Sequence, residues 1–165
     1  MQRGAGLILL LKNVLFTVLV PGTLAVYVPL GFAPQTGAGS DTVLIAVPLL
    51  LVGAAIYAWC VWDFATFGRG TPAPIDAPKK LVVRGLYRWT RNPIYIGVLT
   101  VILGWALLFQ SLGIAQYAIA VGVFFHLWVV FYEEPTLADL FGVEYTAYCS
   151  RVRRWLPWKG RPPDA

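Results

Sequence analysis

Charge is scarce in this sequence of 165 residues. Asp, Glu, Lys and Arg make up 13% of it, while the hydrophobic residues reach 58%. A water-soluble domain carries roughly a quarter of charged residues. This chain therefore has too little charge to cover a soluble surface, and its composition indicates a protein embedded in lipid.

Histidine and cysteine are also rare. The one histidine, His126, lies inside an apolar stretch with no Cys or His cluster around it, so no metal site is predicted. An interhelical hydrogen bond is the simplest role for such a residue. Cys60 lies in an apolar stretch and Cys149 lies near the C-terminus, so we expect no disulfide. No Ser-His-Asp grouping is visible either.

Long apolar stretches are what the sequence has in abundance. They cover residues 7–32, which carry Lys12 near their start, 42–62, and 92–132. About 20 helical residues cross a bilayer core of about 30 Å, so the 41 residues of the third stretch are too many for one span. The natural fold point is the run QSLG at residues 110–113. We predict an all-α integral membrane helical bundle with four transmembrane helices, forming a single domain over residues 1–165.

The Lys and Arg residues gather in three places: the N-terminus, the loop 63–91 and the tail after the last span. The connections at 33–41 and 110–113 contain none. The positive-inside rule then predicts that both termini and the loop 63–91 face the cytoplasm, with the bacterial inner membrane as the expected location. The net charge of +5 is thus a topology signal, and no nucleic-acid binding is predicted. The first apolar run is longer than a signal-peptide core, so no cleavage is expected.

The tail has a helical pattern of its own. Glu134 precedes Pro135, a residue that suits the first turn of a helix. Trp155 and Trp158 stand among basic residues, as interfacial anchors do. We predict an amphipathic C-terminal helix on the cytoplasmic side, lying at the membrane surface or packed on the bundle. Its apolar stripe is Leu137, Leu140, Phe141, Tyr145, Tyr148, Val152 and Trp155.

Polar residues that could bind a ligand or take part in a reaction stand at two span ends. Arg91 and Tyr95 open the third span, and Glu133 and Glu134 close the fourth. An antiparallel pair of spans makes these ends neighbours. Carboxylates at membrane depth need a partner, so one interpretation is an ion pair that clamps the hairpin. The other is a pocket for a ligand with an ammonium, a carboxylate and a flat or sulfonium group, all of which S-adenosylmethionine presents.

Three runs of the sequence carry a family resemblance. They are GRGTP at residues 68–72, LVVRGLYRWTRNPIY at 81–95, and EEPTLADLFGVEYTAY at 133–148. Together they resemble the isoprenylcysteine carboxyl methyltransferase and phospholipid methyltransferase superfamily, over a signature region of residues 68–158. The resemblance implies a small membrane enzyme that uses S-adenosylmethionine. It also implies a cofactor pocket between the C-terminal helices and the Arg-Asn-Pro loop, with a lipid substrate entering from the bilayer.

The resemblance also implies roles for individual residues. Arg91 and Glu134 would matter most for catalysis because they orient the cofactor. Glu134, rather than Glu133, is the residue expected to hold the methionine ammonium. Tyr145 and Tyr148 would close the pocket from the tail helix. The implied cofactor-binding residues are Leu81, Val82, Gly85, Tyr87, Arg91, Asn92, Pro93, Tyr95, Glu133, Glu134, Tyr145 and Tyr148.

Two positions depart from the enzymes that methylate prenylcysteine. Those enzymes commonly have an arginine where Val129 and Val130 stand, and often a histidine where Asn92 stands. The expected activity is methyl transfer from S-adenosylmethionine to a lipid or lipophilic acceptor, of the isoprenylcysteine carboxyl methyltransferase kind. The alternatives are a phospholipid N-methyltransferase, an NADPH-dependent membrane reductase of the sterol-reductase type, and a non-enzymatic scaffold. The oligomeric state is left open.

Overall fold

The computed structural model describes residues 2–33, 40–68 and 80–156, with the side chains of 11–33, 42–68 and 80–156. Most of the GRGTP run, most of the predicted connection 33–41, and Trp158 lie outside the described residues. The described part of the chain forms helices joined by turns and contains no strand. The predicted all-α class is therefore confirmed.

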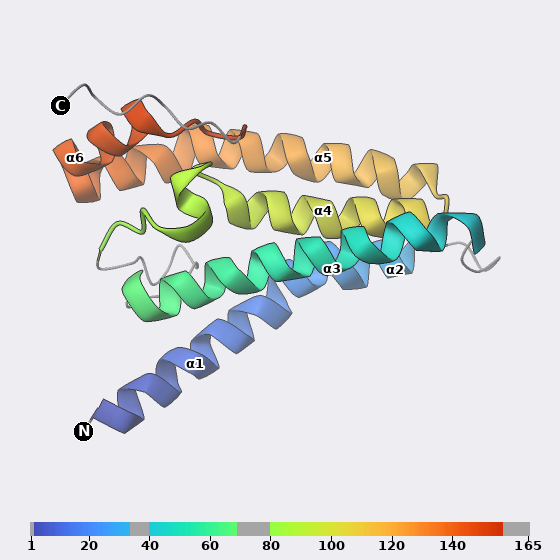
Figure 1. Ribbon diagram of the computed structural model, residues 1–165, viewed down its shortest axis with the longest axis horizontal. Coiled ribbons are helices and arrows are strands. Elements are labelled where there is room, and N and C mark those ends of the chain that lie inside the picture. The colour runs from blue at the N-terminus through green and yellow to red at the C-terminus, as the bar shows by residue number, and fades with distance from the viewer. Residues whose placement is uncertain (1, 34–39, 69–79, 157–165) are drawn as a thin grey trace.

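The first half of the chain consists of two long helical stretches. Helix α1 (Gln2–Leu19) leads through a π-helical turn, η1 (Thr23–Tyr27), into the short α2 (Val28–Gly31). Helix α3 (Ser40–Asp63) ends in a second π-helical turn, η2 (Phe64–Gly68). In Figure 1, α1 diverges from the bundle toward the N-terminus, whereas α3 runs beside α4 along its length.

The second half forms a hairpin and a final helix. A 3₁₀ turn, η4 (Gly85–Arg88), precedes α4 (Pro93–Leu108) and α5 (Leu112–Trp128). A third π-helical turn, η5 (Val129–Glu133), joins α5 to α6 (Glu134–Arg151). Figure 1 shows α3, α4 and α5 side by side, with α6 at the end of the bundle where η4 also lies.

Among the described residues, three helical stretches are long and apolar enough to cross a membrane: Leu11–Gly31, Thr42–Gly68 and Leu112–Arg151. They confirm an integral membrane protein. The third predicted span, α4, has 16 residues and is about 24 Å long, shorter than a bilayer core of about 30 Å. Four full spans are thus confirmed only in part, because α4 is too short to count as a full span. The side of the membrane that each end faces stays a prediction.

The fold point between the last two spans lies where the sequence predicts it. Helix α4 ends at Leu108 and α5 begins at Leu112. Gln110 adopts a positive φ of 48°, which reverses the chain direction. The Ser111 hydroxyl caps α5 by accepting a hydrogen bond from the backbone N–H of Ile114 at 3.3 Å. This turn makes α4 and α5 an antiparallel pair.

Glycines allow α3 and α4 to approach closely. A Cβ on Gly53 would lie 2.8 Å from the backbone oxygen of Gly97 and 2.8 Å from the backbone nitrogen of Val101. Gly53→Ala should therefore push the two helices apart and destabilise the fold by about 1–3 kcal/mol, despite the better helix propensity of alanine. Thermal unfolding in detergent measures this effect.

Gly122→Ala is the matched control for Gly53→Ala. Its Cβ would meet only the Leu99 side chain, at the ordinary contact distance of 3.8 Å. We expect an unchanged or slightly higher unfolding temperature for this variant. Equal unfolding temperatures for the two variants would contradict close packing of α3 on α4.

The predicted tail helix is present as α6, with a kink at Gly142, where φ is 50°. Tyr145 and Tyr148 are buried as the stripe predicts. Leu140 is 55% exposed. A position of α6 at the membrane surface stays a prediction.

Candidate functional site

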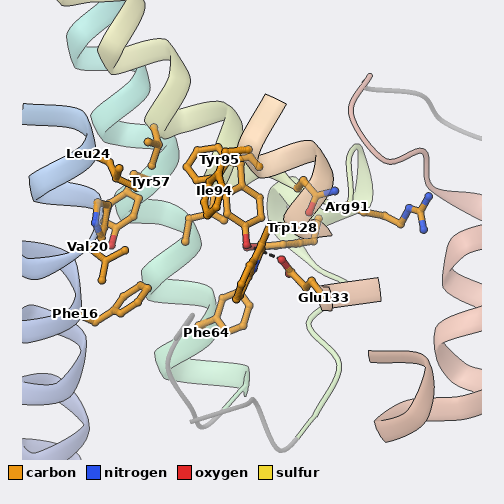
Figure 2. Close-up of a pocket in the computed structure, with 16 residues that line it drawn as sticks. Phe16, Val20, Leu24, Tyr57, Phe64, Arg91, Ile94, Tyr95, Trp128 and Glu133 are labelled. Carbon is orange, nitrogen blue, oxygen red and sulfur yellow. Dashed lines mark hydrogen bonds between the residues drawn. The ribbon is translucent and has the colours of Figure 1, made fainter. Parts of the chain in front are cut away.

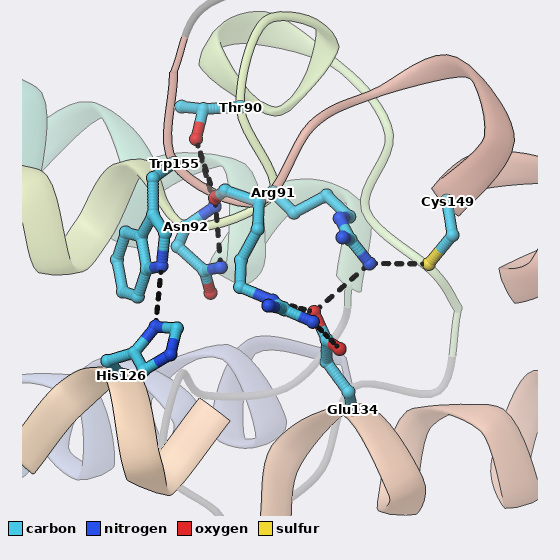
Figure 3. Close-up of polar contacts among 8 residues, drawn as sticks. Thr90, Arg91, Asn92, His126, Glu134, Cys149 and Trp155 are labelled. Atoms are coloured by element: carbon cyan, nitrogen blue, oxygen red, sulfur yellow. Dashed lines mark hydrogen bonds and ion pairs between the residues drawn. The ribbon is translucent and has the colours of Figure 1, made fainter. Parts of the chain in front are cut away.

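The loop before α4 is held to the segment that follows α6. The backbone N–H of Arg91 donates to the carbonyl of Arg153 at 2.9 Å. The Thr90 hydroxyl and the Asn92 side-chain amide both donate to the carbonyl of Arg154, each at 3.0 Å (Figure 3). Residues 90–92 and 153–154 are far apart in the sequence, and these bonds make them one structural unit.

A charge cluster lies beside this unit. Arg154 binds the Glu134 carboxylate with two parallel hydrogen bonds of 2.8 Å, from Nε and Nη2. Arg91 Nη1 lies 3.0 Å from Oε1 of the same carboxylate and donates to Cys149 Sγ (Figure 3). The Glu134 carboxylate raises the pKa of the Arg154 guanidinium above its ordinary value. The cluster therefore combines two cations and one anion.

Glu133 points to a different neighbour. Tyr95 donates its hydroxyl hydrogen to Glu133 Oε2 at 2.5 Å. Consecutive residues on a helix point about 100° apart. The two adjacent glutamates thus contact different parts of the molecule: Glu134 pairs with the arginines, and Glu133 contacts the aromatic residues of the bundle.

A cavity of about 370 Å³ lies next to Glu133, and its wall is mostly apolar and aromatic (Figure 2). Its polar lining residues are Arg91, Asn92, Glu133 and the tyrosines. An apolar cavity with a few polar groups is typical of a small-molecule site. The lining residues are Phe16, Val20, Pro21, Leu24, Tyr57, Phe64, Tyr87, Arg91, Asn92, Ile94, Tyr95, Val98, Phe124, Phe125, Trp128 and Glu133.

The N-terminal helix forms one wall of this cavity, which the sequence did not reveal. Two hydrogen bonds attach this wall to the bundle. The hydroxyls of Thr17 and Tyr57 share a hydrogen bond of 2.9 Å, and the Tyr117 hydroxyl donates to the backbone carbonyl of Leu24 at 3.0 Å. An apolar membrane helix looks alike on all sides in the sequence, so no signal marks the face that lines a cavity.

The expected cofactor residues divide into two groups. Tyr87, Arg91, Asn92, Tyr95 and Glu133 line the cavity. The others stand behind that wall or beside it. Tyr148 donates to the backbone carbonyl of Tyr87 at 2.7 Å, so it supports the wall. The residues outside the lining are Leu81, Val82, Gly85, Pro93, Glu134, Tyr145 and Tyr148.

The turn η4 is fixed by a buried carboxylate that we did not predict. Asp63 is 1% exposed, and its Oδ1 lies 3.1 Å from Arg84 Nε. The Arg84 guanidinium also lies 3.3 Å from the centre of the Phe67 ring. Gly85 follows with a φ of +56° and its Cα packed against Asp63. These contacts place Tyr87, and burial raises the pKa of its phenol well above the ordinary value.

His126 has the structural role that the sequence predicts. Trp155 donates its ring N–H to His126 Nδ1 at 3.1 Å, which links the C-terminal segment to α5 (Figure 3). The Trp155 ring also lies 6.4 Å from the ring of Tyr95. Trp155 therefore packs on the bundle close to the cavity wall.

Comparison with known proteins identifies relatives of this chain. Residues 42–144 match the family model described as phospholipid methyltransferase. The methyltransferases of that family use S-adenosylmethionine. The chain is also similar to methanethiol S-methyltransferase 1 of Bradyrhizobium diazoefficiens, with 34% identity over 74 residues, which are 45% of this chain. The chain spans about a quarter of the length of that relative. No solved structure matches.

Proposed function

The chain belongs to the phospholipid methyltransferase family, and on that premise we propose that it transfers a methyl group from S-adenosylmethionine to an apolar acceptor bound in the cavity. The single observation that carries the proposal is the cavity itself. Its wall is largely aromatic, and its polar lining residues include Arg91, Asn92 and Glu133. A site of this kind encloses an apolar molecule and orients it through a few polar groups.

The residues present fit the proposed cofactor. S-adenosylmethionine has an ammonium, a carboxylate, an adenine ring and a sulfonium. Arg91, Arg154 and Glu134 together carry one net positive charge, which suits an amino-acid head whose carboxylate meets the guanidiniums. Glu134 would hold the ammonium. The aromatic rings of Tyr87 and Tyr95 suit the sulfonium and the adenine.

When bound, S-adenosylmethionine supplies a methyl group on a positively charged sulfur. The chain's residues then have two tasks. The loop at 90–92, held to residues 153–154, keeps the polar end of the site in place. The aromatic lining excludes water and aligns the acceptor, and such alignment can account for much of the rate enhancement.

A thiol acceptor is the second candidate. Its support is the similarity to methanethiol S-methyltransferase 1 and the many rings in the lining, which make favourable contacts with sulfur. Lipid acceptors, phospholipids and prenylcysteine included, stay within the proposal because the apolar wall also suits hydrocarbon. A prenylcysteine carboxylate has the weakest support, since it would meet the carboxylate of Glu133 in the cavity lining.

Ligand titration tests the proposed function. The full chain in lipid nanodiscs is titrated with S-adenosylmethionine, S-adenosylhomocysteine and NADPH. We expect the first two to bind and NADPH not to bind. Binding of NADPH alone would contradict the proposal in favour of a reductase, and binding of none would favour a scaffold. Incubation with methyl-labelled cofactor and either native lipid extract or an alkanethiol then identifies the acceptor.

A further inference from the structure

Glu133 and Glu134 are neighbours in the sequence with unlike surroundings. Glu134 is engaged by two arginines, whereas no ion pair joins Glu133 to a cation within the described part of the chain. Glu133 lines the apolar cavity instead. Burial of a carboxylate at such a place costs free energy, and an ionisable residue inside a membrane protein is by default a candidate for a functional site.

The Glu133 carboxylate is held in one orientation. The Tyr95 hydroxyl donates to Oε2, and the Tyr95 ring is itself packed 4.6 Å from the ring of Phe125. Oε1 is the carboxylate oxygen that does not take part in this hydrogen bond. It is thus an oriented proton acceptor at the wall of a cavity that would hold the acceptor molecule.

We propose that Glu133 is a catalytic base and that the methyl acceptor is a neutral apolar thiol; this rests on the proposed function. Glu133 Oε1 takes the thiol proton, and the electron pair left on the thiol sulfur forms the bond to the methyl carbon. The bond from that carbon to the sulfonium sulfur breaks, and its electron pair goes to that sulfur. The cationic sulfonium and the anionic carboxylate give way to two neutral thioethers and a carboxylic acid.

The chemistry of the acceptor explains why a base is needed. A cysteine-like thiol has a pKa of about 8.5 and is mostly protonated at pH 7. The thiolate is the nucleophile, so removal of the proton speeds the reaction. A carboxylate acceptor, by contrast, needs no base and would be repelled by Glu133. The position of Glu133 therefore favours an acceptor that has a proton to lose.

Glu133→Gln tests the role of the base, because glutamine keeps the shape and can still accept the Tyr95 hydrogen bond. The probes are 1-hexanethiol, which is protonated at neutral pH, and thiophenol, which is largely ionised. We expect the rate with 1-hexanethiol to fall about 100- to 1,000-fold, and the rate with thiophenol to fall less than about tenfold. Glu133→Asp retains a carboxylate, so its rate with 1-hexanethiol should be at least about tenfold higher than that of Glu133→Gln.

Two readouts separate a base from a merely structural residue. The binding of S-adenosylhomocysteine and of 1-hexanethiol, measured by calorimetry, should change less than about threefold in Glu133→Gln, a free-energy change below about 0.7 kcal/mol. The rate of that variant with 1-hexanethiol should rise about tenfold per pH unit as the thiolate fraction rises. Glu144→Gln makes the same change at an exposed position of α6 and should leave both rates unaltered.

The outcomes distinguish this inference from the proposed function. Equal loss with both thiols in Glu133→Gln, while both ligands still bind, would overturn the role of the base. A wild-type protein that methylates carboxylate acceptors but no thiol would overturn the thiol class and leave methyl transfer in place. A wild-type protein that binds neither S-adenosylmethionine nor its product would instead overturn the proposed function.

Discussion

Replacement of Glu134 by glutamine is expected to lower the affinity for S-adenosylmethionine about 100-fold. Glu134 accepts two hydrogen bonds from Arg154 and lies 3.0 Å from Arg91. A hydrogen bond to a charged group contributes about 1.5–3 kcal/mol, and loss of about 3 kcal/mol corresponds to about 100-fold in affinity. A neutral amide cannot orient both arginines, nor can it attract an ammonium group.

Calorimetric titration with S-adenosylhomocysteine measures this loss, and Glu144→Gln on the same helix is the control because its side chain is exposed. Size-exclusion chromatography checks that the Glu134→Gln protein remains monodisperse. Unchanged affinity together with a lower unfolding temperature would show that the cluster of Arg91, Glu134 and Arg154 only clamps the hairpin. That outcome would remove Glu134 from the proposed cofactor site.

Gly85→Ala should destabilise the fold by about 3 kcal/mol, which lowers the unfolding temperature by about 6–12 °C for a domain of this size. Two effects add. The φ of +56° disfavours any residue with a Cβ by about 1–2 kcal/mol. The new Cβ would also collide with Asp63 Oδ2, whose carboxylate has no room to withdraw because it is buried. The turn η4 would shift, and Tyr87 with it.

Gly142→Ala separates the two effects in Gly85→Ala. Gly142 has nearly the same φ, +50°, but nothing lies within 4 Å of the position that its Cβ would take. Only the backbone effect remains there, so we expect a loss of about 1–2 kcal/mol. Similar losses at Gly85 and Gly142 would mean that the Asp63 contact contributes little to the placement of η4.

The hairpin and the meeting of Arg91 with Glu134 could be predicted from the sequence. An uncharged stretch too long for one span must fold back, and an antiparallel fold makes its two ends neighbours. The polar residues at those ends therefore had to meet, and their ion pair is present at 3.0 Å. A lone histidine inside an apolar span predicted a hydrogen bond between helices, and His126 accepts one from Trp155 of the segment after α6.

Other parts of the site depend on contacts that no local pattern records. Arg154 looks like one more basic residue of the tail, and only the return of the chain toward α4 brings it to Glu134. Asp63 ends an apolar helix and gives no sign that Arg84 and Gly85 will pack on it. The cavity face of α1 is equally invisible, because each side of that helix is apolar.

The π-helical turn η5 has a consequence for the alignment of this chain with its relatives. In this turn the backbone N–H of Glu134 donates a hydrogen bond to the carbonyl of Val129, five residues back. The turn therefore holds one residue more than an α-helical turn does. Without that residue, everything after it would be rotated by about 100°. A relative with an unbroken α-helix here should therefore show a one-residue gap. An alignment without that gap would put the glutamate that faces the arginines in a column different from that of Glu134.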